Sequence, residues 1–281
     1  MNTKERIKNF CDNYNIRLLI GTPAFGGMVH LSYMNSMLKL VSTFKDIGIN
    51  FDIMNFGNES LITRGRNAII ARLLSDNFTH LLFIDADLDF KVEDVINLLL
   101  SKKELIGGIY TKKSINIKKF IKNLSSKKTK NYNDLLIKSS DYCFNPILDE
   151  NNKIKYEKEL ILCKNIPTGF MMIQKTLIES MVLKYNDLKY INNLNGYSSI
   201  CDAEMFYNFF DVKIIDDIYL SEDYYFCYLV SKMGVNIYCD PDISLGHTGS
   251  FCYRGNLSQS DIQNNLELDL DTELLKKTYL N

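Results

Sequence analysis

The sequence predicts an α/β protein with a doubly wound, largely parallel central sheet. Short apolar runs alternate with longer stretches of helical apolar spacing along much of the chain, as expected when each strand is followed by a covering helix. Residues 81–84 are apolar at every position, which is typical of a strand buried on both faces. The composition agrees with a globular fold, since 46% of the residues are hydrophobic and 24% are charged.

The first 110 residues contain most of this alternation. A polar helical segment leads into a first strand, which Gly21 and Pro23 end. A loop containing Gly26 and Gly27 follows, and Thr63 is a candidate N-cap for the second covering helix. In chain order we expect a helix at 1–15, a strand at 17–23, a helix at 31–44, a strand at 50–56, a helix at 61–74, a strand from 80, a helix at 92–100 and a strand at 105–110.

The alternation weakens at 111–164, which is rich in Lys, Asn and Ser. We expect a variable insertion there, either a solvated, mobile excursion or a lid or acceptor-binding flap over the site. Further along we expect a strand at 167–173, a helix from 175, irregular structure at 186–217, a helix at 223–233 and a strand at 235–238. These patterns predict one domain spanning 1–258, followed by a polar tail at 259–281.

Charge and cysteine content exclude several classes of protein. The formal net charge of −1 gives no reason to expect a nucleic-acid partner. The seven cysteines are scattered without a Cys-x-x-Cys pair, which favours reduced thiols and argues against a zinc site. No signal peptide or apolar run long enough to span a membrane is found. We therefore expect a cytoplasmic protein, with its oligomeric state left open.

Three acids follow the apolar strand at alternating positions: Asp85, Asp87 and Asp89. In α/β folds, ligands bind at the carboxyl ends of strands. Carboxylates so close together repel each other unless a cation lies between them, and hard oxygen ligands suit Mg²⁺ or Mn²⁺ shared with substrate phosphates. The alternative is an acidic strand-to-helix loop, in which Asp87 or Asp89 caps the next helix.

A second group of polar residues lies near the end of the predicted domain. Glu222 and Asp223 open a predicted helix, and His247 follows the last predicted strand. Acids at a helix N-terminus are also favoured by the helix dipole alone, and a single histidine is more often structural than a ligand.

Taken in order, these motifs resemble the nucleotide-sugar glycosyltransferases of the GT-A fold, and most of all their large inverting, family 2-like group. The resemblance runs from about residue 17 to residue 249. It rests on Asp85-Ala86-Asp87, then Gly-Gly-x-Tyr at 107–110, Thr-Gly-Phe-Met-Met-Ile at 168–173, Glu222-Asp223 and His247.

The resemblance implies a role for each matching position. Asp87 would bind the metal directly, with His247 as a further ligand and Asp85 contacting the ribose or the metal shell. Asp223 would be the catalytic base, and Glu222 would shape its surroundings. Donor-binding residues implied in the same way are Thr22 and Pro23 beside the base, and Arg64 and Asn67, one helical turn apart, at the nucleotide or diphosphate.

The implied activity is that of a metal-dependent glycosyltransferase (hexosyltransferase type) with Mn²⁺ or Mg²⁺ as cofactor. It would move a sugar from a nucleotide-diphosphate donor, with UDP favoured, to a hydroxyl of a glycan, protein or small-molecule acceptor, with inversion. Lys112 and Lys113 could reach the diphosphate or the acceptor, or could be solvated surface lysines. The alternatives are a nucleotidyltransferase or other metal-dependent phosphoryl-transfer enzyme, and a non-catalytic nucleotide-sugar-binding protein.

Overall fold

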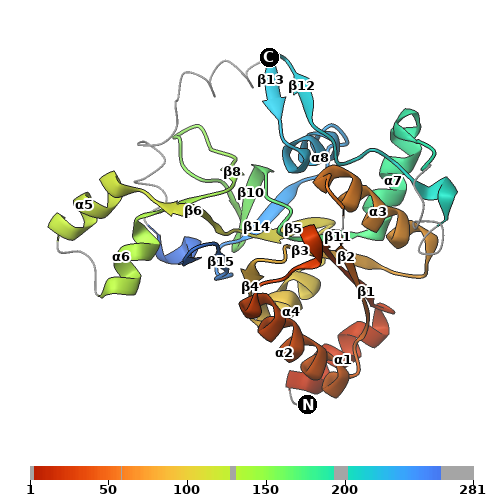
Figure 1. Ribbon diagram of the computed structural model, residues 1–281, viewed down its shortest axis with the longest axis horizontal. Coiled ribbons are helices and arrows are strands. Elements are labelled where there is room, and N and C mark those ends of the chain that lie inside the picture. The colour runs from red at the N-terminus through yellow and green to blue at the C-terminus, as the bar shows by residue number, and fades with distance from the viewer. Residues whose placement is uncertain (1–2, 58, 127–130, 193–201, 261–281) are drawn as a thin grey trace.

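The computed structural model describes residues 3–57, 59–126, 131–192 and 202–260. Its centre is a sheet of nine described strands in the order β2-β1-β3-β11-β5-β14-β10-β8, with β9 paired to β10 (Figure 1). These strands are β1 (Arg17–Ala24), β2 (Asn50–Gly57), β3 (His80–Ile84), β5 (Leu105–Gly108), β8 (Asn145–Pro146), β9 (Tyr156–Glu157), β10 (Leu160–Asn165), β11 (Phe170–Gln174) and β14 (Ile237–Asp240).

Most strands of this sheet run in one direction. β1 is parallel to both β2 and β3, and β14 is parallel to β5. β11 lies antiparallel between β3 and β5, which leaves β3 and β5 pointing the same way. The predicted α/β class with a mostly parallel sheet is confirmed. The reversed direction of β11 could not be predicted, because an apolar run looks the same in either direction.

Helices cover both faces of the sheet, as Figure 1 shows. β3 shows why both are apolar: Leu81 and Phe83 point into one hydrophobic cluster, and Leu82 and Ile84 into the other. One face is covered by α1 (Thr3–Asn13), α2 (Leu31–Ile47) and α4 (Val92–Leu100), and the other by α3 (Ile62–Ser75), α7 (Lys175–Lys184) and α8 (Glu222–Ser231). The fold is therefore doubly wound.

The N-cap residues of α3 and α4 differ from the candidates that the sequence suggested. The N-cap of α3 is Leu61, which makes no side-chain cap, so Thr63 lies inside the helix. The N-cap of α4 is Lys91, whose backbone N–H donates to Asp94 Oδ2 at 3.0 Å. Neither Asp87 nor Asp89 caps that helix.

The predicted insertion at 111–164 is more regular than its composition suggests. Its last strand, β10, belongs to the central sheet, and so do β8 and β9. The apolar run at 160–163 is the sequence signal for β10. The rest contains β6 (Thr111–Ile115), α5 (Ile117–Ser126), α6 (Tyr132–Lys138) and β7 (Ser140–Tyr142), in addition to β8 and β9.

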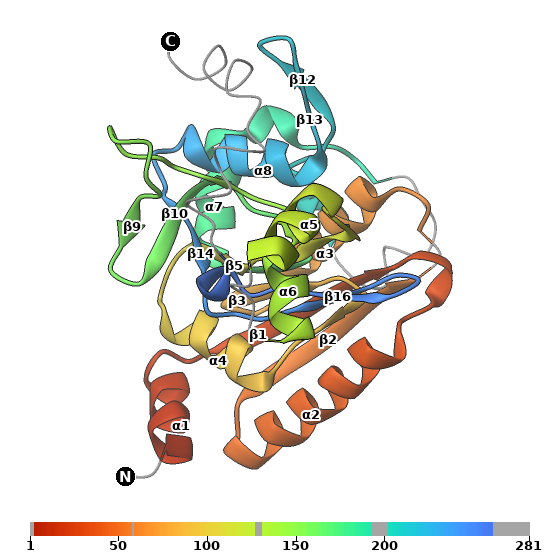
Figure 2. The ribbon, with the colours of Figure 1, turned by 90° about the vertical axis from the view of Figure 1, so that its left-hand side faces the viewer.

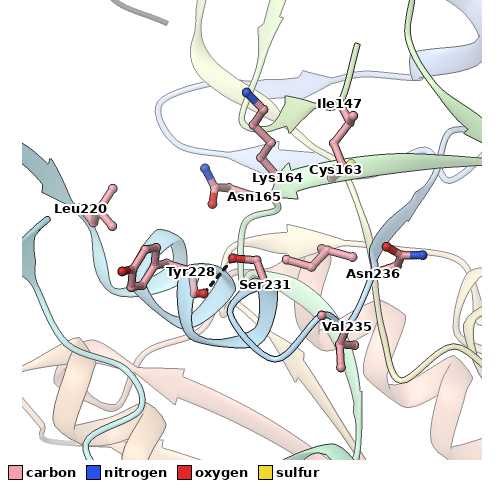
Figure 3. Close-up of a pocket in the computed structure, with 11 residues that line it drawn as sticks. Ile147, Cys163, Lys164, Asn165, Leu220, Tyr228, Ser231, Val235 and Asn236 are labelled. Carbon is pink, nitrogen blue, oxygen red and sulfur yellow. Dashed lines mark hydrogen bonds between the residues drawn. The ribbon is translucent and has the colours of Figure 1, made fainter. Parts of the chain in front are cut away.

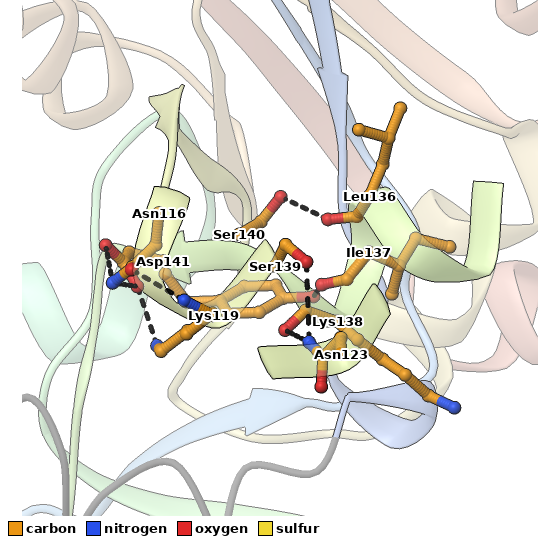
Figure 4. A network of polar contacts seen from close by, with 10 residues as sticks. Asn116, Lys119, Asn123, Leu136, Ile137, Lys138, Ser139, Ser140 and Asp141 are labelled. Atoms are coloured by element: carbon orange, nitrogen blue, oxygen red, sulfur yellow. Dashed lines mark hydrogen bonds and ion pairs between the residues drawn. The ribbon is translucent and has the colours of Figure 1, made fainter. Parts of the chain in front are cut away.

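A buried polar network holds α5 and α6 to β7 (Figure 4). Lys119 is only 8% exposed, and its Nζ lies 2.7 Å from Asp141 Oδ1. Asn123 donates from Nδ2 to the carbonyl oxygen of Lys138 at 3.1 Å. Because these contacts fix the orientation of α5, they also decide which of its side chains face outward.

Smaller sheets complete the described fold. One joins β4 (Leu88–Asp89), β15 (Gly246–Thr248) and β16 (Cys252–Arg254), and another pairs β12 (Lys213–Ile215) with β13 (Ile218–Leu220). The short 3₁₀ helices are η1 (Phe25–Gly27), η2 (Asn186–Leu188), η3 (Ala203–Met205) and η4 (Leu257–Gln259).

Two expectations from composition can be compared with the described part of the chain. The six cysteines that it contains are all free thiols, and Cys201 lies outside it. No helix in those residues is sufficiently long and apolar to cross a membrane. The predicted tail at 259–281 lies almost wholly outside the described residues.

Candidate active site

A cavity of about 630 Å³ opens at the carboxyl ends of β1 and β3. Ligand sites in open α/β sheets are expected at this edge. Its lining comes from the end of β1 and the loop that follows it to His30, the first half of α3, the residues directly after β3 and the first turn of α8. Three of these segments, distant in sequence, place three acids and an arginine around one space: Arg66 from α3, Asp85 and Asp87 after β3, and Glu222 from α8.

Asp85 directly follows β3 and is held on two sides. Its backbone N–H donates to the carbonyl oxygen of Gly169 at 2.8 Å, and its Oδ1 accepts from Arg66 Nη2 at 3.1 Å. A Cβ at position 169 would lie 2.7 Å from Asp85 Oδ2 and 2.5 Å from the Tyr110 hydroxyl oxygen. Only glycine allows these two side chains to lie so close to the backbone.

Arg66 is the buried cation of the cavity, with its side chain 4% exposed. Its Nε lies 3.5 Å from Glu222 Oε1, and its guanidinium lies over the ring of Phe83. Burial opposes the charge, but the carboxylates of Asp85 and Glu222 outweigh it and raise the pKa of Arg66. Nε and Nη1 make no hydrogen bond to the described residues, so this cation retains donors for an anionic ligand.

Asp87 and His247 come together because β4 and β15 pair. Leu88 is opposite His247 in that ladder, and Thr248 N–H donates to the Asp87 carbonyl oxygen at 2.8 Å. His247 Nε2 lies 3.7 Å from Asp87 Oδ1. Asp87 Oδ1 is buried and has no hydrogen-bond partner among the described residues.

The backbone fixes which nitrogen of His247 faces Asp87. Nδ1 lies 2.8 Å from the carbonyl oxygen of Thr111, which can only accept, so Nδ1 carries the proton. Burial lowers the pKa of His247, partly opposed by this hydrogen bond and by Asp87. The ring is therefore neutral at pH 7 and presents the Nε2 lone pair to Asp87.

These two atoms could serve as ligands of a divalent metal, because the ligand atom of a histidine must carry no proton and Asp87 Oδ1 has no hydrogen-bond partner among the described residues. An imidazole nitrogen and a carboxylate oxygen suit Mn²⁺ or Mg²⁺. Among the described residues, however, no group of three His, Cys, Asp or Glu side chains is arranged to hold an ion. Asp85, predicted to contact ribose or the metal shell, instead pairs with Arg66.

Lys113 contacts Asp87 directly. Its Nζ is 2.5 Å from Asp87 Oδ2, and it reaches the acid from β6, at the start of the insertion. Lys112, the other lysine considered, is exposed on the same strand. The third acid of the motif, Asp89, pairs with Arg254 and does not line the cavity.

Asp223 lies in the first turn of α8, next to the cavity-lining Glu222. Its Oδ1 accepts from the Ser221 hydroxyl and from the Tyr224 N–H. Burial, followed by the negative charge of Glu222, raises the pKa of Asp223. Oδ2 makes no hydrogen bond to any residue that the structure describes.

The predicted donor-binding residues have different surroundings. Pro23 lines the cavity, whereas Thr22 is fully buried and its hydroxyl lies 2.7 Å from that of Tyr33. Arg64 pairs with Glu59, and its side chain does not line the cavity.

Asn67 is part of the packing between α3 and the segment after residue 202. It is 1% exposed, and its Nδ2 donates to Asn208 Oδ1 and to the Phe210 carbonyl oxygen. Its Oδ1 accepts from the Phe210 N–H at 2.9 Å. Each polar atom of the Asn67 side chain therefore has a partner in the protein, and its contact with the nucleotide or diphosphate stays a prediction.

Arg66 was missed by the sequence-based reasoning, although a signal was present. It shares one face of α3 with Ile62, Ile69 and Leu73 at spacings of four, three and four residues. An arginine within such an apolar stripe must find buried partners, which here are Asp85 and Glu222.

A second cavity, of about 370 Å³, lies near the other end of α8, between that helix and β10 (Figure 3). Asn165, Tyr228 and Ser231 are among its lining residues, and no carboxylate is. It lacks the acids that metal-dependent transfer chemistry needs, so we assign the candidate active site to the first cavity.

No protein-family model matches the chain, and a search of curated proteins gave no match. Among solved structures, the chain is similar to 4-diphosphocytidyl-2C-methyl-D-erythritol synthase from Anaerococcus prevotii, with 11% identity, a TM-score of 0.32, and coverage of 83% of this chain and 100% of that one. It is also similar to residues 1–349 of TarS from S. aureus, with 12% identity, a TM-score of 0.35, and coverage of 86% of this chain but 61% of that one. Identities and scores this low assign no activity.

Proposed function

We propose that this protein is a metal-dependent glycosyltransferase that moves a hexosyl unit from a nucleoside-diphosphate donor, with UDP as the first candidate, to an acceptor hydroxyl. The proposal is supported above all by one arrangement: Asp85, Asp87 and Glu222 surround one cavity together with the buried Arg66. The neighbouring Asp87 Oδ1, which has no hydrogen-bond partner among the described residues, and His247 Nε2 would be the two metal ligands.

The charges around the cavity suit a diphosphate leaving group. Arg66 has two donor nitrogens without hydrogen bonds in the described structure, and Lys113 offers a second cation beside Asp87. Asp87 and His247 would hold Mn²⁺ or Mg²⁺, which when bound neutralises charge that develops on the departing diphosphate. Pro23, at the end of β1, would border the nucleotide base.

In this proposal Asp223 is the general base. Ser221 and Tyr224 fix its Oδ1, and Oδ2 takes the proton from the acceptor hydroxyl as that oxygen bonds to the anomeric carbon. The bond from the anomeric carbon to the diphosphate oxygen breaks at the same time, and the nucleoside diphosphate leaves. Attack from the face opposite the leaving group inverts the anomeric centre without a covalent enzyme intermediate.

The test is donor binding and turnover with and without Mn²⁺. A panel of nucleotide sugars is screened by thermal shift, then by release of nucleoside diphosphate, for the wild type, Asp87→Ala and Asp89→Ala. We expect Mn²⁺-dependent nucleotide binding in the wild type and its loss in Asp87→Ala. Asp89→Ala is the matched control, since Asp89 belongs to the same motif but pairs with Arg254 outside the cavity lining. Equal Mn²⁺-dependent affinity in wild type and Asp87→Ala would contradict the metal assignment.

A further inference from the structure

Helix α5 exposes a row of large apolar side chains. Ile117, Ile121 and Leu124 are 63%, 58% and 58% exposed, at spacings of four and three residues that place them on one face. The opposite side of the helix packs inward through Lys119 and Asn123, whose polar contacts are shown in Figure 4. The network therefore holds the apolar stripe toward solvent.

The region around this stripe is strongly basic. Residues 111–133 contain eight lysines and no Asp, Glu or Arg, although the whole chain has a formal net charge of −1. Lys113 and Lys119 are neutralised by Asp87 and Asp141. Lys118 and Lys122 are exposed on α5 and lie next to the apolar stripe, since they follow Ile117 and Ile121 in sequence.

We propose that α5 is an interfacial helix that binds the surface of a bilayer containing anionic phospholipids. The stripe of Ile117, Ile121 and Leu124 enters the headgroup region, while Lys118 and Lys122 contact lipid phosphates. With 10 residues, α5 is too short to cross a bilayer and lies in its plane.

A bilayer fits these features better than a protein partner does. Figure 1 shows α5 projecting at the edge of the molecule, on an arm formed with β6 and α6, and Figure 2 shows α5 and α6 from that side, so that a flat surface can reach α5. The excess of lysine complements a surface of uniform negative charge. The apolar stripe itself would have no role in binding a nucleic acid, which lysines alone would attract.

The first experiment is sedimentation of the full-length protein with vesicles. We expect it to bind vesicles of phosphatidylcholine with about one third phosphatidylglycerol, and not phosphatidylcholine alone. Lys118→Glu combined with Lys122→Glu should weaken partitioning by roughly 30-fold or more, since each basic residue near such a surface contributes about 1 kcal/mol. Ile121→Glu combined with Leu124→Glu should weaken it by about tenfold or more.

Matched control variants carry the same kinds of substitution at exposed sites outside α5. Lys153→Glu with Lys155→Glu makes the same change in net charge at exposed sites between β8 and β9. Leu183→Glu replaces a leucine that is 85% exposed on α7. Both should bind anionic vesicles like the wild type, and circular dichroism confirms that each variant is folded.

Fluorescence gives a second measurement, because the chain contains no tryptophan. Leu124→Trp should show a blue-shifted emission on adding anionic vesicles and quenching by brominated lipids, while Leu183→Trp should show neither. Three outcomes overturn the proposal: no binding to anionic vesicles, equal binding by the α5 variants and the wild type, or an unshifted Leu124→Trp spectrum on bound protein. Binding to RNA that is lost in the lysine variant and kept in the apolar variant, without vesicle binding, would assign α5 to a polyanion instead.

Discussion

At the scale of single residues, the ion pair between Lys113 and Asp87 would weaken binding of the proposed metal. The ammonium lies 2.5 Å from Asp87 Oδ2, while Oδ1 and His247 Nε2 face each other at 3.7 Å. A metal bound to Asp87 must share that carboxylate with a positive charge. Under the proposed function, Lys113 would therefore oppose metal binding in the free protein and would contact the diphosphate once the donor is bound.

Lys113→Met should raise the affinity for Mn²⁺ in the absence of nucleotide by about tenfold, since removing a cation in contact with a ligand removes a repulsion of about 1 kcal/mol or more. Calorimetry with Mn²⁺ alone measures this. Lys112→Met is the control, because that exposed lysine on the same strand does not pair with Asp87. A weaker or unchanged Mn²⁺ affinity in Lys113→Met would show that the lysine does not compete with the metal.

Gly169 is a second residue whose identity is set by its neighbours. In Gly169→Ala the new methyl group would contact the Tyr110 hydroxyl and Asp85 Oδ2 below van der Waals distance. We expect a loss of stability of about 1–3 kcal/mol from this overpacking, together with impaired donor binding as Asp85 moves. Urea denaturation and nucleotide calorimetry measure the two effects.

The control for this substitution is Gly65→Ala in α3, where an added methyl has only ordinary contacts at 3.7 Å. Alanine is the better helix former, so this variant should be as stable as the wild type or more so. If Gly169→Ala behaves like Gly65→Ala, the packing of Asp85 against this backbone does not constrain the site.

At the scale of elements, the first turn of α8 carries both the candidate base and a residue that lines the cavity. Glu222 lines the cavity and pairs with Arg66. Asp223 accepts hydrogen bonds from Ser221 and Tyr224. Asp223→Asn should keep donor affinity and reduce transfer by about 10²–10⁴-fold, because the amide cannot accept the proton of the acceptor hydroxyl. Calorimetry with the donor and a transfer assay with the acceptor measure the two on one variant.

A purely structural role for Asp223 gives a different result, since Asn is also a good residue at a helix start and would leave transfer nearly normal. The pH profile adds a second criterion. The base works as a carboxylate, and burial with Glu222 raises its pKa. Wild-type transfer should therefore begin to fall, as the pH is lowered, at a higher pH than an ordinary aspartate would give.

Several elements were predicted from the sequence because their signal is local. The helix at 92–100 and the strand starting at residue 17 agree with the structure at those positions. β10 was missed because it follows a lysine-rich stretch and is only six residues long, so its apolar run was included in the insertion. One of its pairing partners, β14, comes more than seventy residues later, and no local pattern reports such a contact.

The candidate site likewise contains residues that local sequence patterns can locate and residues that only tertiary packing determines. The two acids after β3 and the acids opening α8 lie at element ends that periodicity can locate, and the structure brings Asp85, Asp87 and Glu222 to one cavity. The choice between Arg64 and Arg66 depends on the rotation of α3 against the sheet. That rotation is set by tertiary packing, so the resemblance that implied roles for Arg64 and Asn67 gave no signal for Arg66.

At the scale of the whole molecule, buried histidine links stability to pH. His80, at the start of β3, is 8% exposed, and burial lowers its pKa to about 4. The unfolded chain takes up a proton near pH 6.5, and the folded chain does so only near pH 4. The contribution of His80 to the free energy of unfolding is therefore fully present above about pH 6.5, and it is lost as the pH falls toward 4.

His80→Gln should remove this part of the pH dependence. We expect the wild type to lose roughly 2.5 kcal/mol more than the variant between pH 7.5 and pH 4.5, because each pH unit between the unfolded pKa of 6.5 and the folded pKa of about 4 costs about 1.4 kcal/mol. Urea denaturation at the two pH values measures the loss. Parallel losses in both proteins would mean that other groups account for the acid sensitivity.

The reversed strand β11 affects the order in which this chain can acquire its structure during synthesis. It separates β3 from β5, so Ile84 finds its partner only when Phe170 has been made. Until then a ribosome-bound chain carries two almost wholly apolar strands with open edges, at the centre of what will become the sheet. Unpaired edges of this kind are sites of misassociation in slow-folding, long-range topologies. Chaperone dependence and poor recovery of truncated products are thus expected from the position of one five-residue strand.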